Sequence, residues 1–148
     1  MHPALALAKS LERNDALTAI FWGLTVNILN QGRVAESLPW VVDVLDVANA
    51  SGDVNLLISG HALACNCHFW SGSYTKVLEH ADKVLDHYDD EKHHHLAAIL
   101  HHDPKTLSVT FASICTWILG YPDRAYRLAE KKRRTHASAV TRSILGLH

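Results

Sequence analysis

Apolar residues recur at helical spacing along most of the chain, and short breaks that contain glycine or proline separate these stretches. The stretch 117–130, WILGYPDRAYRLAE, shows the pattern. Its apolar residues stop at Gly120-Tyr121-Pro122 and resume at helical spacing with Ala125. Because glycine turns freely and proline suits the first turn of a helix, this stretch predicts a buried helix, a tight corner and a second amphipathic helix.

The same corner recurs around Gly32 and Gly72, so that the spacing is 40 residues from Gly32 to Gly72 and 48 residues from Gly72 to Gly120. Small or compact apolar residues occupy matching positions around the three glycines. They lie seven before each glycine (Thr25, Cys65, Ser113), five after it (Ser37, Val77, Ala125) and nine after it (Val41, Ala81, Ala129). Small residues at the seam of a repeated helical hairpin predict a helical solenoid.

The predicted elements are a leading helix at about 3–13, hairpins at about 15–31 with 37–50, 54–70 with 73–88 and 104–119 with 122–134, and a final helix at about 136–147. Ser37 is expected to cap its helix and to place Pro39 in the first turn, and Asp103 with Pro104 is expected to start the helix at 104.

The predicted fold class is therefore all-α. We expect a right-handed superhelix of antiparallel helical hairpins, about three of them plus flanking helices, in a single domain over 1–148. The hairpin pattern is that of a diverged tetratricopeptide repeat, although 40 residues exceed the standard unit of about 34.

Composition supports a folded helical chain with no long-range attraction for nucleic acid. Apolar residues make up 48% of the 148 residues, glycine and proline are few (7 and 4), and the net charge is −1 with histidine neutral. The chain shows no secretory signal and no apolar run that suits a membrane span. Its three cysteines, an odd number without a C-x-x-C pair, indicate reduced thiols and a cytoplasmic protein.

A more specific string of residues lies in the second half of the chain. It comprises Tyr88-Asp89, then His102-Asp103-Pro104, Trp117, and Leu119-Gly120-Tyr121-Pro122-Asp123 with Ala125. This string resembles the tetratricopeptide-like repeat region at the C-terminal end of large bacterial signalling proteins, which carry a class III adenylate/guanylate cyclase domain and an AAA-type ATPase domain.

The resemblance implies a sensory or scaffold segment attached to a cyclase or ATPase, and a chain that is a fragment or a stand-alone remnant of such a protein. It assigns no activity to any residue here, because the chain has neither the phosphate loop G-x-x-x-x-G-K-[ST] nor a recognisable cyclase pair of metal-binding carboxylates.

Histidines gather between the second and third repeats, in the segment 93–103. His93, His94, His95, His101, His102 and Asp103 are residue types that bind Zn²⁺ or Ni²⁺. On a helix, however, they divide between two faces, so four converging ligands are not expected. The segment is interpreted as a loop with a short helix, and alanine at 93–95 is expected to leave stability nearly unchanged.

His61, Cys65 and His68 fall on one helical face with a spacing that suits three metal ligands. They also occupy the repeat positions of Phe21, Thr25 and Ile28, which favours a packing role. Cys65 or Cys67 beside His68 supplies the residue types of a nucleophilic site, but burial would raise the pKa of either thiol and make it inert.

Two further groups of residues have a structural and a functional interpretation. The tryptophans Trp22, Trp40, Trp70 and Trp117 could line a ligand site, but core packing is expected of them. The basic run at 130–134, EKKRR, is expected to be a solvated helix end rather than a phosphate site.

The leading hypothesis is a non-catalytic interaction, scaffold or sensory module without catalytic residues, cofactor or bound metal. Its expected partner is a protein or a neighbouring domain, and self-association is expected through the uncovered final helix at Ile144, Leu145 and Leu147. The alternatives are a sensor that holds a small ligand in the concave groove of the superhelix, and an enzyme or metal-binding protein that uses the His and Cys residues.

Overall fold

The computed structural model describes residues 14–130, and these residues form helices joined by short turns, with no strand among them. The helices are α2 (Asn14–Asn30), α3 (Val34–Ser51), α4 (Val54–Trp70), α5 (Tyr74–His87), α6 (Asp90–His93), α7 (Leu96–Leu100), α8 (Pro104–Ile118) and a further helix at 122–130. The predicted all-α class is confirmed. Within the described range, no helix has the length and apolar character needed to cross a membrane.

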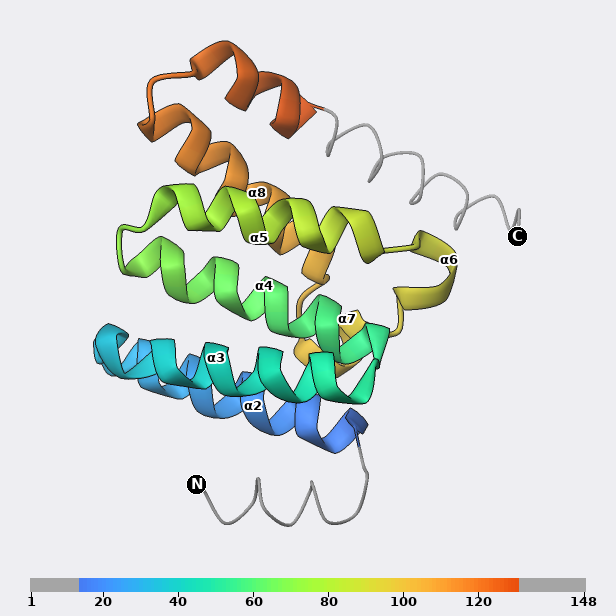
Figure 1. Ribbon diagram of the computed structural model, residues 1–148. Helices are drawn as coiled ribbons and strands as arrows, with labels where there is room; N and C mark the ends of the chain where they lie inside the picture. Colours follow the sequence, from blue (N-terminus) through green and yellow to red (C-terminus); the bar gives the residue numbers. More distant parts are fainter. Residues whose placement is uncertain (1–13, 131–148) are drawn as a thin grey trace.

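Consecutive long helices lie in pairs, and the pairs lie one above the other (Figure 1). Helix α2 packs on α3, and α4 packs on α5. Each later pair places its first helix against both helices of the pair before it: α4 contacts α2 and α3, and α8 contacts α4 and α5. The short helices α6 and α7 form the connection to α8, at one side of the stack.

The corner glycines Gly32, Gly72 and Gly120 lie at the turn inside each pair and have φ angles of 74°, 76° and 92°. At each corner the glycine N–H donates to the carbonyl three residues earlier. The next N–H donates to the carbonyl five residues earlier, with N···O distances of 2.9–3.2 Å. This left-handed closure satisfies carbonyls that the end of the helix would otherwise leave unpaired.

Gly120→Ala is expected to lower the free energy of unfolding by about 1 kcal/mol, because a side chain is strained at positive φ. Nothing lies within 4 Å of a Cβ added at Gly120 or at Gly23, so steric clashes do not complicate the comparison. Gly23 lies inside α2, so Gly23→Ala is expected to stabilise the chain by up to about 1 kcal/mol. Urea unfolding of both variants measures the difference. Equal effects would contradict the turn assignment.

The second helix of the first pair begins earlier than the sequence predicted. Helix α3 starts at Val34 after Arg33, which forms an exposed ion pair with Glu36. The prediction that Ser37 caps this helix is therefore wrong: Ser37 is buried, and its Oγ donates to the carbonyl of Val34 at 2.6 Å. Pro39 consequently lies inside the helix.

The start of α8 agrees with the prediction. Asp103 is the N-cap, and its Oδ1 accepts from the N–H of Thr106 at 2.6 Å, with Pro104 in the first turn.

The segment 93–103 forms two short helical turns and contributes two leucines to the core, which its interpretation as a loop with a short helix did not foresee, and the effect of alanine at 93–95 stays a prediction. Leu96 and Leu100 are 1% and 0% exposed and join the main hydrophobic cluster of α2, α3 and α4. His93 is also buried, and its Nδ1 accepts from the N–H of Asp89 at 2.8 Å. The physical reason is that α7 packs against α2, α4 and α8 and fills the space at that end of the stack.

Candidate interaction groove

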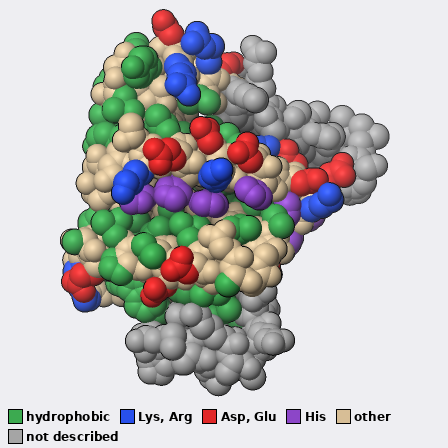
Figure 2. Space-filling view, in the orientation of Figure 1, with side chains coloured by type: hydrophobic (Ala, Val, Ile, Leu, Met, Phe, Trp, Pro, Cys, Tyr) green, Lys and Arg blue, Asp and Glu red, His purple; other side chains and the backbone are tan. Residues whose placement is uncertain are grey.

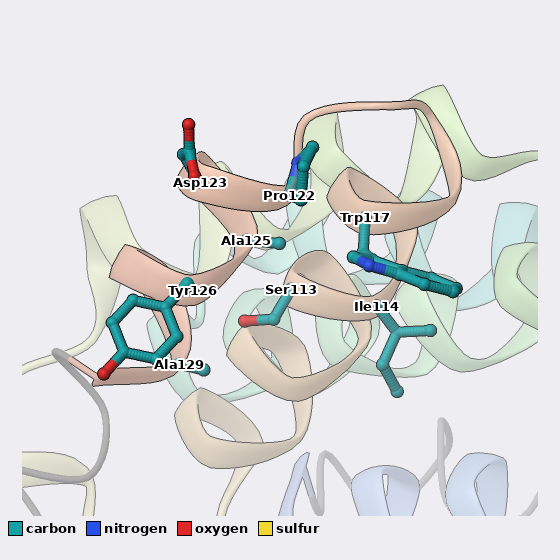
Figure 3. A pocket seen from close by; sticks show the side chains of 8 residues that line it. All are labelled: Ser113, Ile114, Trp117, Pro122, Asp123, Ala125, Tyr126 and Ala129. Carbon is teal, nitrogen blue, oxygen red and sulfur yellow. The ribbon is translucent and has the colours of Figure 1, made fainter.

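An apolar groove of about 570 Å³ lies between α8 and the helix at 122–130 (Figure 3). The Gly120 turn brings these two helices together at one end. The groove is lined by Ser113, Ile114, Trp117, Pro122, Asp123, Ala125, Tyr126 and Ala129.

Small residues form the floor of the groove, and larger ones form its rim. Ala125 is 6% exposed and, like Ser113, lies between the two helices. Ser113 Oγ donates to the carbonyl of Val109 at 2.8 Å, so this hydroxyl is already satisfied within α8. The floor therefore presents little unpaired polar surface to an occupant.

The rim carries large exposed side chains. Trp117 is 65% exposed, Tyr126 70% and Ile114 40%. The prediction of core packing is therefore wrong for Trp117. It is also wrong for Trp70, which is 60% exposed and donates from Nε1 to Asn66 Oδ1 at 2.9 Å. Exposed aromatic side chains beside an apolar groove are typical of protein contact surfaces.

The corresponding positions in the second pair are covered by the next helix. Phe69, like Trp117, lies three residues before its corner glycine, but it packs against Phe111 of α8 with ring centroids 4.6 Å apart. Ala81, nine residues after its glycine, is 1% exposed, whereas the equivalent Ala129 is exposed. The groove is thus the place where each earlier pair receives the first helix of the following pair.

The structure also brings together histidines that the sequence did not connect. His61 of α4 and His80 of α5 place their Nδ1 atoms 2.9 Å apart, and His68 stacks on His80 with ring centroids 5.3 Å apart. Figure 2 shows histidine side chains in a row on this face. One Nδ1–H must donate to the other Nδ1, so the two neutral rings are different tautomers. Nothing in the sequence connected His80 with His61, because the two residues meet only when α4 and α5 pack together across the Gly72 corner.

Burial is the main reason why the pKa values of His61 and His80 are lowered to about 4. Nearby groups act in the same direction: His87 and Lys83 on His61, and His61, His68 and Lys76 on His80. Burial also lowers the pKa of His68, again assisted by Lys76 and opposed by Glu79. The cluster is therefore neutral at pH 7.

The trio of His61, Cys65 and His68, whose spacing suits metal ligands but for which a packing role was favoured, does not form a metal site. Cys65 is fully buried, and its thiol donates a hydrogen bond to the carbonyl of Val77, with 3.6 Å between Sγ and the oxygen. Across residues 14–130, no group of three or more His, Cys, Asp or Glu side chains is arranged to hold a metal ion.

Burial raises the pKa of all three thiols, to about 12 for Cys65 and about 11 for Cys67 and Cys115. The predicted raised pKa of Cys65 and Cys67 is confirmed. Since the thiolate is the nucleophilic form, none of these cysteines is activated for catalysis.

Other predicted site residues lie apart from the groove or outside the described range. His94 and His95 are exposed, and their Nδ1 atoms lie 2.9 Å from the carbonyls of Glu91 and Lys92. Ile144, Leu145 and Leu147, and most of the basic run at 130–134, lie outside the described residues.

The chain matches no protein-family model, no curated protein and no solved structure in the comparisons with known proteins. The kinship with the repeat region of cyclase and ATPase signalling proteins therefore stays a prediction.

Proposed function

We propose that this protein is a non-catalytic interaction module whose groove between α8 and the helix at 122–130 binds an amphipathic helix of a protein partner. The observation that carries the proposal is the apolar groove with Trp117 and Tyr126 exposed on its rim. Burial of such aromatic side chains supplies much of the binding energy in protein interfaces.

The chemistry of the groove favours a helix over a small polar ligand. Small-molecule pockets usually add several converging polar groups to an apolar wall. Besides the indole N–H of Trp117 and the phenolic hydroxyl of Tyr126, the lining contains only Ser113 and Asp123 as polar or charged side chains. Ser113 is already paired within α8. A bound helix needs no such converging polar groups, because its backbone N–H and C=O groups are already hydrogen-bonded within the helix.

In the wider proposal, the helix pairs form a right-handed tetratricopeptide-like solenoid that positions its partner, in the manner of a scaffold or sensory segment in a bacterial cyclase or ATPase signalling system of the cytoplasm. The placement of α4 against α2 and α3, and of α8 against α4 and α5, supports this architecture.

A labelled peptide with the α8 sequence, residues 104–118, is a direct probe, because α8 already occupies the equivalent groove of the preceding pair. We expect fluorescence anisotropy to report binding. Trp117→Ala should weaken that binding by about tenfold or more, since a central aromatic anchor is lost.

Trp70→Ala is the matched control. Trp70 is a comparably exposed indole near the Gly72 corner, but it does not line the groove. Its removal should leave the peptide affinity unchanged. Equal affinity losses for the two tryptophan variants, with both folded by circular dichroism, would contradict the assignment of the groove.

A further inference from the structure

We propose that residues 136–147 of the same chain occupy this groove and that a partner helix must displace them, so that the protein regulates its own binding surface. The inference rests on the proposed function, because it concerns access to the same groove.

The first argument is continuity with an interface seen earlier in the stack. Helix α4 lies against both helices of the first pair, and α8 lies against both helices of the second. The groove between α8 and 122–130 is the next position in that series. The helix expected there is the one that follows 122–130 in the chain.

The second argument is proximity. The last described residue, Glu130, follows directly on Ala129, which lines the groove. Residues 131–135 are left to make the connection, whereas Gly52 and Asp53 alone connect α3 to α4. A segment tethered by so few residues has an effective concentration of order ~1 mM near its binding site. A free partner helix must therefore bind the groove with higher affinity, or be present at higher concentration, to displace the segment.

The third argument is the spacing of apolar residues. Ser108, Ala112 and Cys115 of α8 are buried against the second pair, at spacings of four and three residues. Val140, Ile144 and Leu147 repeat this spacing in the segment that the sequence predicts to be helical. They are larger, and the wall that would receive them is smaller at one position, where Ala125 replaces Val77.

The α8 peptide tests the inference on the full-length chain. The variant with Ile144→Glu and Leu147→Glu puts two charges on the apolar face of 136–147. It should bind the peptide about tenfold more tightly than the parent, because the competing segment is released. The control, Ser138→Glu with Ser143→Glu, adds the same charge away from that face and should bind like the parent. Light scattering on each protein reports the oligomeric state.

Three outcomes would overturn the inference, and they are distinguishable. Equal affinity of the parent and the Ile144/Leu147 variant would show that the groove is open in the parent, and the proposed function would stand. A parent dimer that the two substitutions convert to a monomer would show that the segment comes from a second copy. Peptide binding by neither protein would overturn the proposed function together with the inference.

Discussion

Leu100→Ala is expected to lower the free energy of unfolding by about 2–5 kcal/mol, the range for deletion of a large buried aliphatic side chain. Leu100 is 0% exposed and belongs to the main hydrophobic cluster, although it lies in the histidine-rich connection. Alanine there would leave a cavity where α7 meets α2, α4 and α8. Urea unfolding followed by circular dichroism measures the loss.

Exposed histidines of the same connection provide the control. His94→Ala and His95→Ala should each change the free energy of unfolding by less than about 0.5 kcal/mol. His93→Ala should lie between these limits and the leucine variant, since it removes the acceptor of a part-buried hydrogen bond from the N–H of Asp89. A stability of Leu100→Ala within 0.5 kcal/mol of the parent, on the same scale as the exposed sites, would argue that the connection does not belong to the core.

Acidification from pH 7 to about pH 4 is expected to destabilise the fold through His61 and His80. Their pKa is about 4 in the folded chain and about 6.5 in the unfolded chain. Between these values the unfolded state binds more protons, so stability falls as the pH falls. After discounting for the partial solvent exposure of both rings, we expect a loss of about 1 kcal/mol per histidine.

Burial of the two rings is the main cause of this loss, and nearby groups act in the same direction. His87, Lys83 and Lys76 of α5 oppose a positive charge on the pair, and protonation of both rings would also place two N–H groups against each other. The variant with His61→Gln and His80→Gln should therefore lose about 2 kcal/mol less than the parent between pH 7 and pH 4.

His94→Gln, at an exposed ring, is the matched control for the acid dependence and should retain the parent's response. Unfolding free energies at several pH values between 4 and 7 make the comparison. An acid dependence that the double glutamine variant leaves unchanged would show that the His61–His80 contact does not control it.

The local elements of this protein could be predicted from sequence because their causes are local. A glycine at Gly32, Gly72 or Gly120 supplies the positive φ that ends one helix and allows the next to turn back. Asp103 with Pro104 supplies a side-chain acceptor and a preset φ at the start of α8. Ser37 shows the limit of this reasoning, because Arg33 and Glu36 begin the helix before it.

Which apolar side chains are buried and which remain exposed was decided only by the tertiary structure. Phe69 and Trp117 have the same position relative to their corner glycines, yet Phe69 packs against Phe111 and Trp117 is 65% exposed. Periodicity along a helix identifies its apolar face. Whether another helix covers that face depends on elements far away in the chain, because burial is a property of the assembled packing.

The same distinction explains the histidines and the connecting segment. The sequence by itself determined that His61 lies on a first helix of a pair, and that a break precedes Asp103. Only the packing of α5 on α4 brought His80 within 2.9 Å of His61, and only the packing of α7 made Leu100 part of the core. Contacts between residues that are distant in sequence are set by three-dimensional packing, so no local pattern of residue types predicts them.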